Sequence, residues 1–349
     1  MNYLFYILII LFISCPISSF AGQVNTFIYH RFDEQRYPST NISSDVFKQQ
    51  LDYLKDNQIE LISLSEIAAR LESGQPLPEH AVALCVDDSY RSFYDVAMPV
   101  LRQYGYPVTL FVNTDAVGTS GYLSWEELKS LHGEGVEIGN HTASHAYLVE
   151  ALPGENLKQW RERIKADILK AQESFEQRLG IRPKLFAYTF GEYSTVVVEI
   201  VKEMGFTAAF AQQSGVIHDQ YDRYILPRFP MGGPFATLKG FVNKLHMRPL
   251  VVLDQEPFDP VIAENPPVLS FKLVDNTIHP GRFNCFVQGN NHCRVERDMG
   301  KGAGWYKIIA DEPLSGRRNK YTLTLQGKKS EWLWFSHPWI NADNSIAPE

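Results

Sequence analysis

The feature that most constrains the fold is an alternation of short apolar runs with longer helical patterns between about residues 23 and 249. The short runs have the length and residue types of β-strands, and turn-forming residues flank them. They comprise 24–29, 81–86, 108–112, 136–139, 184–188, 208–211 and 224–226. Parallel strands need long crossover connections, which are usually helices. We therefore expect an α/β fold, a barrel-like parallel sheet with helices outside it.

The helical patterns between these runs have one clear example, residues 155–179. Apolar side chains there recur at spacings of three and four residues, and Gly180 follows as a helix-ending residue. Further helices are predicted at 44–57, 65–72, 94–104, 124–132 and 194–204.

The composition changes near residue 250, where Glu-Pro, Asp-Pro and Asn-Pro-Pro sequences begin. Residues 22–250 are expected to form the α/β domain, and residues 251–267 an extended linker. Residues 268–349 contain alternating strand patterns without a good helix, which predicts a smaller all-β domain. Its aromatic residues can either fill a core or stack on sugars; they are Trp305, Tyr306, Trp332, Trp334 and Trp339.

The first 21 residues have the character of a signal peptide. An uncharged apolar run over residues 4–13 precedes Ser19-Phe20-Ala21, which resembles a signal-peptidase site. A lipoprotein signal ending at Cys15 is the alternative. The apolar run is short for a membrane span, so no stable span is expected after cleavage. These features predict an exported protein, periplasmic or secreted.

Composition and cysteine positions narrow the class of protein. A formal net charge of −7 gives no basic face for phosphates, so nucleic acid is not expected as a partner. Cys285 and Cys293 flank a turn sequence, Gly289-Asn290-Asn291, so a hairpin there would bring their sulfurs together as a disulfide. Cys85 lies in an apolar run and is expected to be a buried free thiol.

Ionisable residues follow several of the predicted strands directly. His30 follows 24–29, Asp87 and Asp88 follow 81–86, and His141 comes just after 136–139. In parallel α/β folds the carboxyl ends of the strands share one edge of the sheet, where ligands and catalytic groups gather. We therefore expect these side chains to converge on one rim.

The residue types on this rim are those of a catalytic metal site. His141 and His145 are four apart and could bind one ion through their imidazoles. With one carboxylate of the Asp87-Asp88 pair they would leave ligand positions open, as catalytic zinc sites do. The alternatives are a double Asp that caps a helix and a coincidental pair of histidines.

Two motifs resemble those of the polysaccharide deacetylases, the NodB-homology or carbohydrate esterase family 4 group. Cys85-Val86-Asp87-Asp88-Ser89-Tyr90 is similar to their T-F-D-D-G-Y motif, and residues 141–145, His-Thr-Ala-Ser-His, match H-[ST]-x-x-H. Tyr29-His30 resembles the branch of bacterial poly-N-acetylglucosamine deacetylases, in which one catalytic motif is permuted to the amino end. The resemblance covers roughly residues 26–230.

This resemblance implies a role for each matching residue. Asp88, His141 and His145 would hold a divalent metal, usually Zn²⁺ in this family. Asp87 would be the general base and His30 the general acid, and the backbone N–H of Phe190 would help to stabilise the oxyanion. The implied substrate is an N-acetylated polysaccharide or oligosaccharide.

The sequence also departs from the family motifs. Ser89 replaces a Gly, Thr189 replaces a Pro, and Ala187 stands where an Arg commonly supports the base. Arg228 follows another predicted strand and either supplies that charge or is an ordinary surface residue.

For the general acid there is a second histidine to consider. Leu245-His246 resembles the family's L-x-H motif but ends a helical pattern, so His30 is preferred. A buried, hydrogen-bonded strand histidine is the alternative interpretation of His30.

The leading functional hypothesis is therefore a metal-dependent hydrolase that removes N-acetyl groups from a polysaccharide. An exported carbohydrate-binding protein that has lost turnover is the second hypothesis, motivated by the substituted motif positions. A non-haem iron oxygenase with two His and one carboxylate ligand is the third, but it leaves Asp87 without a role.

Overall fold

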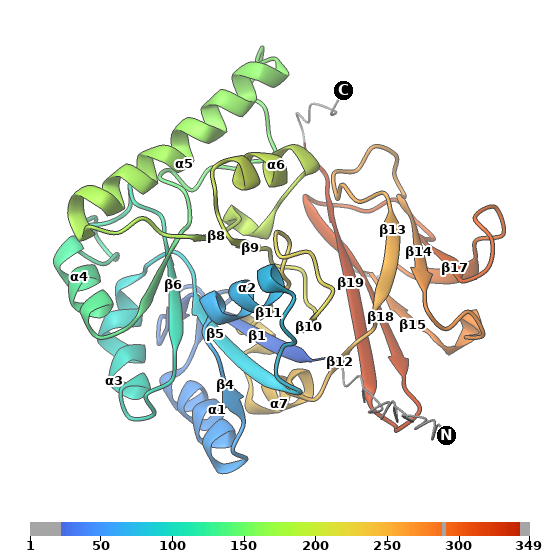
Figure 1. The fold of residues 1–349 in the computed structure, drawn as a ribbon, viewed down its shortest axis with the longest axis horizontal. Helices are drawn as coiled ribbons and strands as arrows, with labels where there is room; N and C mark the ends of the chain where they lie inside the picture. The colour runs from blue at the N-terminus through green and yellow to red at the C-terminus, as the bar shows by residue number, and fades with distance from the viewer. Residues whose placement is uncertain (1–21, 288–290, 343–349) are drawn as a thin grey trace, which may run out of the picture.

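The computed structural model describes residues 22–287 and 291–342, and the predicted signal peptide lies outside these residues. The chain forms an α/β part, drawn blue to yellow in Figure 1, and an all-β part, drawn orange to red. The predicted fold class is confirmed: a half-barrel sheet carries helices, and a separate all-β region follows it.

The α/β part is built on a nine-stranded sheet whose main path runs β10-β1-β5-β6-β7-β8-β9. Strands β1 and β5 to β9 are mutually parallel, as the helical connections require. Two short strands extend it: β11 pairs with β1, and β4 pairs with β5. The strands are β1 Gln23–Tyr29, β4 Glu60–Leu61, β5 Ala81–Val86, β6 Val108–Val112, β7 Glu137–Asn140, β8 Leu185–Ala187, β9 Ala208–Phe210, β10 Ile217–His218 and β11 Phe229–Pro230.

The centre of the sheet is buried on both faces. Every residue of β1 and β5 is buried, which explains their continuous apolar character. The two strands run in register from Val24 opposite Ala81 to Tyr29 opposite Val86. Both therefore end at the same height, and the residues that follow them emerge on one rim.

Most helices cover this sheet on its outer side, whereas residues 64–68 of α2 pack with Val24, Ile28 and Ala83 on the inner side (Figure 1). The longest, α5, is amphipathic as predicted: Trp160, Ile164 and Phe175 are among its buried residues, and Gly180 ends it in the left-handed conformation at φ 72°. The helices are α1 Ser44–Asp56, α2 Leu64–Ser73, α3 Met98–Leu101, α4 Trp125–Gly133, α5 Leu157–Leu179, α6 Thr195–Glu203 and α7 Leu238–Leu245. Short strands β2 Arg31–Phe32 and β3 Asn41–Ile42 pair with each other beside α1.

Two predicted elements are wrong in detail. The helix expected over 94–104 consists of a π-helical turn, Phe93–Ala97, followed by the short α3. Pro99 lacks the N–H that a regular helix needs, which accounts for the irregular hydrogen bonding. The strand expected over 224–226 is a turn in which the Asp222 side chain accepts a hydrogen bond from the Tyr224 N–H, and only Leu226 bridges to β9.

The all-β part consists of two four-stranded sheets packed on a shared core that includes Phe271, Tyr306 and Trp339. One sheet has the order β12-β19-β18-β15 and the other β13-β14-β17-β16. The strands are β12 Arg248–Pro249, β13 Val252–Glu256, β14 Val268–Leu273, β15 Asn284–Phe286, β16 Cys293–Arg297, β17 Trp305–Ala310, β18 Arg318–Gln326 and β19 Trp332–Ile340.

The segment 251–267, predicted as an extended linker, is not free of structure. It begins with β13, which pairs antiparallel with β14. Further along, Asp259 accepts a hydrogen bond from the backbone N–H of Thr195 at the start of α6, at 2.8 Å. The segment is extended, as its prolines require, but it is fastened to both parts of the molecule. The placing of domain boundaries at 250 and 268 stays a prediction.

The predicted disulfide between Cys285 and Cys293 is present. It does not close a hairpin, however. Cys285 lies on β15, which pairs with β18, and Cys293 lies on β16, which pairs with β17 in the other sheet. The disulfide therefore links the two sheets.

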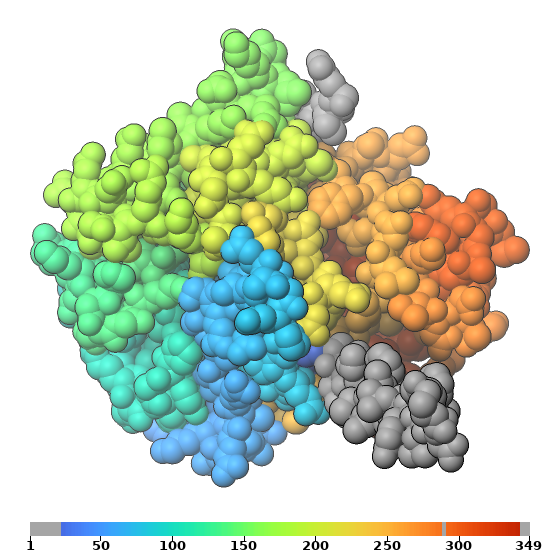
Figure 2. Space-filling model, viewed as in Figure 1, coloured from blue at the N-terminus to red at the C-terminus, as the bar shows by residue number. Residues whose placement is uncertain are grey.

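The two parts of the molecule are in direct contact, and the all-β part covers one side of the α/β part (Figure 2). Ser214 makes two of the polar contacts: its carbonyl accepts a hydrogen bond from the Trp334 indole at 3.0 Å, and its hydroxyl lies 3.1 Å from the Lys320 ammonium. Strand β12, directly after α7, pairs with β19 and so joins the all-β sheet. Within the described residues, no helix is both long enough and apolar enough to cross a membrane.

A tight contact inside the sheet yields a stability prediction. Gly139 on β7 lies opposite Phe111, and a Cβ at Gly139 would come within 2.3 Å of the Phe111 ring. Gly139→Ala is therefore expected to destabilise the protein by about 1–3 kcal/mol. Gly133→Ala is the matched control, because a Cβ there meets nothing within 4 Å at the end of α4, and it should leave stability unchanged or raise it by up to about 1 kcal/mol. Urea unfolding measures both, and equal stabilities would contradict the packing described.

Candidate metal centre

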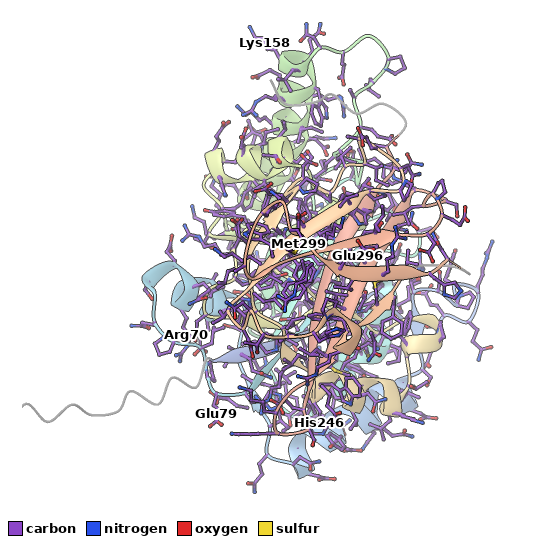
Figure 3. All side chains as sticks on the ribbon, turned by 90° about the vertical axis from the view of Figure 1, so that its right-hand side faces the viewer. Arg70, Glu79, Lys158, His246, Glu296 and Met299 are labelled. Carbon is purple, nitrogen blue, oxygen red and sulfur yellow. A yellow bond between two sulfur atoms is a disulfide. The ribbon has the colours of Figure 1, made fainter. Side chains whose placement is uncertain are left out.

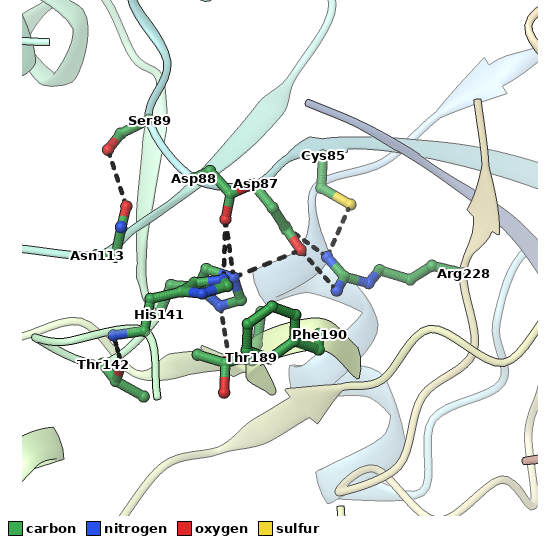
Figure 4. A network of polar contacts seen from close by, with 12 residues as sticks. Cys85, Asp87, Asp88, Ser89, Asn113, His141, Thr142, Thr189, Phe190 and Arg228 are labelled. Carbon is green, nitrogen blue, oxygen red and sulfur yellow. Dashed lines mark hydrogen bonds and ion pairs between the residues drawn. The ribbon is translucent and has the colours of Figure 1, made fainter. Parts of the chain in front are cut away.

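The candidate site lies on the rim formed by the carboxyl ends of the parallel strands. Asp87 and Asp88 follow β5, His141 follows β7, and His30 follows β1. Figure 4 shows the aspartates and His141 pointing toward one another, with Arg228 reaching Asp87 from the other side. In the structure these residues lie together on one rim, as expected.

Asp88, His141 and His145 form a cluster that could hold a metal ion. Their ligand atoms all lie within 4.8 Å of one another. The Asp88 Oδ1 atom is 3.4 Å from His141 Nε2 and 3.1 Å from His145 Nε2. Such a set of one carboxylate and two imidazoles is typical of an open divalent-metal site.

Hydrogen bonding around the cluster tests whether a cation fits there. The Nδ1 atom of His141 donates to the Ala187 carbonyl at 2.8 Å, which leaves a lone pair on Nε2 of the neutral ring. That lone pair faces Asp88 Oδ1, a buried oxygen that accepts no well-formed hydrogen bond from the described residues. A proton or a metal cation between these atoms removes the repulsion, so the residues fit a bound divalent ion.

The pKa values of His141 and Asp88 are shifted in the directions that favour a positive charge between the two side chains. Burial tends to lower the pKa of His141, but the charge of Asp87 and the contact with Asp88 outweigh burial and raise it. Burial tends to raise the pKa of Asp88, but the two imidazoles hold it well below its usual value. Asp88 is therefore ionised at neutral pH and available to a cation.

Asp87 is held by Arg228, which is fully buried. The guanidinium donates two hydrogen bonds to the carboxylate, at 2.7 and 2.9 Å, and a third to the Ala211 carbonyl at 2.9 Å. The interpretation of Arg228 as an ordinary surface residue is therefore wrong. The pair fixes Asp87 beside the cluster, 3.9 Å from His141 Nε2.

Cys85 is a buried free thiol, as predicted. Its sulfur lies 3.5 Å from the Arg228 guanidinium, and burial raises the pKa of the thiol to about 12. The thiol remains protonated at neutral pH, which excludes a thiolate nucleophile there.

The backbone at the site adopts an unusual conformation. Asp88, Ser89, Thr142, His145 and Phe190 all have positive φ angles between 55° and 74°. Such angles are costly for residues with a Cβ and persist where the surrounding structure enforces them, often at functional sites. Ser89 occupies a position where the motif it resembles has Gly, the residue that this backbone conformation favours.

The loop that carries Phe190 packs against the metal cluster. The Phe190 ring stands edge-on to His145 at 4.5 Å and stacks on Tyr147 at 4.0 Å. Thr189, in place of the motif proline, donates from its hydroxyl to the Ala146 carbonyl at 2.5 Å. These contacts join the Phe190 loop to the loop of the two histidines.

The all-β part also reaches this site, through residues that the sequence analysis did not select. Arg317 pairs with the buried Glu192 at 2.7 Å and lies 3.8 Å from the centre of the Tyr147 ring. Arg318 donates to the Phe190 carbonyl at 3.1 Å. Because Arg317 and Arg318 are distant in sequence and belong to no motif, no local signal identified them.

The two candidate acid histidines occupy different ends of β1. His30 follows its carboxyl end, and burial lowers the pKa of the ring. His246 follows α7, close to the amino end of β1. The hydrogen bond that shows this runs from the Asn25 side chain, near that end of β1, to the carbonyl of Lys244 at 2.8 Å. His246 lies 3.3 Å from the Tyr53 hydroxyl and is not part of the metal cluster.

The aromatic residues of the all-β part divide into two groups. Tyr306 and Trp339 are buried in its core, so they are not available to stack on a sugar. Trp332 is 42% exposed, and Trp305 and Trp334 are partly exposed.

Comparison with known proteins agrees with this fold and site. Residues 74–209 match the family model described as polysaccharide deacetylase. This range includes the double aspartate, both histidines and the Phe190 loop. Residues 74–209 are therefore similar to the polysaccharide deacetylase family, and the predicted resemblance is confirmed.

Two curated relatives carry the name poly-β-1,6-N-acetyl-D-glucosamine N-deacetylase. The protein from Escherichia coli K12 is 25% identical over 242 residues, covering 58% of this chain and 36% of the relative. The protein from Staphylococcus aureus MRSA252 is 24% identical over 214 residues, covering 60% of this chain and 73% of the relative. The chain thus spans about a third of the length of the first relative.

Two solved structures share the fold. Deacetylase PplD from Streptococcus pyogenes aligns with a TM-score of 0.57 and 20% identity, covering 64% of this chain and 99% of the other. IcaB from Ammonifex degensii aligns with a TM-score of 0.56 and 23% identity, covering 64% and 97%.

The buried pair of Asp87 and Arg228 yields a prediction about stability. Arg228→Met leaves the Asp87 carboxylate buried without its cation and is expected to cost about 3–5 kcal/mol in urea unfolding. In an Asp87→Asn background the same substitution should cost much less, because no charge remains to be neutralised. Equal costs in the two backgrounds would mean that the pair is not coupled.

Proposed function

We propose that this protein is a metal-dependent hydrolase that removes N-acetyl groups from an N-acetylhexosamine polysaccharide. The observation that carries the proposal is the cluster of Asp88, His141 and His145 beside the Arg228-held carboxylate of Asp87. The names of the curated relatives support an N-acetylglucosamine polymer with β-1,6 links as the substrate.

Asp88, His141 and His145 would hold a divalent ion, and zinc suits this set of oxygen and nitrogen ligands. A bound divalent ion of this kind polarises a carbonyl and lowers the pKa of water from 15.7 to about 7. The chain's own residues must then position the amide and move the protons.

Asp87 would take a proton from the attacking water. Its paired guanidinium keeps the carboxylate oriented, and Arg228 is thus a positioning residue. The backbone N–H of Phe190 would donate to the oxygen on which negative charge develops. His30 would give a proton to the departing amine, and a lowered pKa makes the protonated ring a stronger acid for that step.

The pairing of Asp87 with Arg228 also bears on the two alternative hypotheses. Neither a carbohydrate-binding protein nor an iron oxygenase needs a second, oriented carboxylate beside the ligand cluster. The hydrolase uses both aspartates, which is why we favour it. We further propose that the protein is exported, in keeping with its disulfide and its predicted signal peptide.

Acetate release tests the proposed function. Zinc-loaded protein is expected to release acetate from β-1,6-linked N-acetylglucosamine oligomers faster than from chitooligosaccharides or peptidoglycan. Protein treated with a chelator serves as the control and should recover activity when zinc is restored. Binding without acetate release in the loaded protein would contradict hydrolysis, and oxygen-dependent turnover would favour the oxygenase.

Two substitutions separate the proposed base from the proposed ligands. Asp87→Asn should keep the metal while lowering kcat by about 10²-fold or more, because the base is lost. His141→Ala should instead lose the metal, since it removes one of the ligands. Metal content after dialysis and acetate release measure both effects. Full activity in Asp87→Asn would show that another group acts as the base.

A further inference from the structure

Two adjoining hollows lie between the two parts of the molecule, and the first of them reaches the Phe190 loop beside the candidate metal centre. A hollow of about 470 Å³ begins at Phe190 and Arg318 and extends to Pro230 and Lys320. A second hollow, of about 630 Å³, shares Pro230 and Lys320 and continues to Trp332. We call the second hollow the flank groove; its main lining residues are Phe235, Lys244, Phe286, Lys320, Trp332 and Trp334.

One wall of the flank groove is a flat sheet surface. Lys320, Thr322 and Thr324 alternate along β18 and share one face, while Tyr321 and Leu323 point into the all-β core. Trp334 lies opposite Thr324 on β19, and Phe286 lies opposite Thr322 on β15. Arg318, two residues before Lys320 on the same strand, contacts the Phe190 loop. The surface therefore extends from the Phe190 loop, which packs against the metal cluster.

The groove combines exposed rings with hydrogen-bonding side chains. Trp332, Phe286 and Phe235 are 42%, 55% and 52% exposed, although large aromatic residues are usually buried. Asn243 and Asn284 line the same hollow. A long apolar surface with a few polar groups is the composition of a ligand site, and ring faces suit the apolar faces of sugars.

The charge of the groove restricts which sugars it can hold. Lys244, Lys320 and His246 line it, and no carboxylate does so among the described residues. Burial, together with the charge of Lys320, lowers the pKa of Lys244 to about 8, which indicates an environment that disfavours further positive charge. Each acetyl group removed from a sugar exposes an amine that binds a proton. The groove therefore disfavours the product of deacetylation.

The geometry points to the flank groove as a binding site for the neutral, still N-acetylated stretch of the polysaccharide, extending from the sugar at the metal centre. This inference rests on the proposed function, because it assigns the groove to the same substrate. It explains why an all-β part is fastened beside the active site: its sheet face supplies half of the groove.

Binding of the polymer tests the inference without turnover. Polymers of graded acetylation are titrated against zinc-loaded Asp87→Asn protein, and the dissociation constant is measured by calorimetry. Trp332→Ala and Phe286→Ala in this background are expected to weaken binding of the acetylated polymer by about tenfold. Met299→Ala is the control, because Met299 is 85% exposed in the loop between β16 and β17, outside the groove (Figure 3); it should bind as tightly as its parent.

The fully deacetylated polymer should bind more weakly than the acetylated one, and Lys244→Gln should narrow that difference. Unchanged affinity in Trp332→Ala and Phe286→Ala would overturn the groove as the binding site. Tighter binding of the deacetylated polymer, or of an anionic polymer such as hyaluronate, would overturn the assignment of a neutral chain. Groove-dependent binding without acetate release from the unsubstituted, zinc-loaded protein would refute the proposed hydrolysis and leave the groove assignment standing. Acetate release, combined with binding that does not depend on the groove residues, would support the proposed hydrolysis and overturn the groove assignment.

Discussion

The buried ion pair between Asp87 and Arg228 is the interaction on which the site depends. Two adjacent aspartates at the end of a buried strand place two negative charges where water is scarce, and each requires a positive partner. Arg228 satisfies the first of them with two short hydrogen bonds. Among the described residues Asp88 has no such internal partner, and it lies beside two imidazole nitrogens. A cation bound between these three groups would neutralise its charge. Arg228 and a bound cation would thus give the two carboxylates different roles.

The loops that carry the site residues contact one another and the all-β part. Asp88, His145 and Phe190 all have positive φ angles, the Phe190 ring contacts His145, and the stacked Tyr147 joins two of the loops. Arg317 then ties this group to the all-β part through Glu192. Contacts from both parts of the molecule thus hold the geometry of the site.

Much of the α/β fold and most of the rim could be predicted from local sequence. Strand lengths and helical periodicity indicated the parallel sheet, and the shared edge of such a sheet placed His30, Asp87, Asp88 and His141 together. Support of Asp87 was one of two interpretations of Arg228, and the sequence could not decide between them, because Arg228 is 141 residues away and only the folded sheet brings the two together. The disulfide was foreseen, but not its path between two sheets, since cysteine spacing does not reveal which strands pair. The contacts of Arg317 had no sequence signal for the same reason: nothing local requires them.

The most direct test of the central claim is the position of a zinc ion in the folded protein. Anomalous diffraction from crystals grown with Zn²⁺ is expected to show one ion within about 2.0–2.2 Å of an Asp88 oxygen and of one nitrogen each of His141 and His145. In the same map, Asp87 should remain paired with Arg228 and should not ligate the ion. An ion bound elsewhere, or these three side chains turned away from one another, would contradict the account.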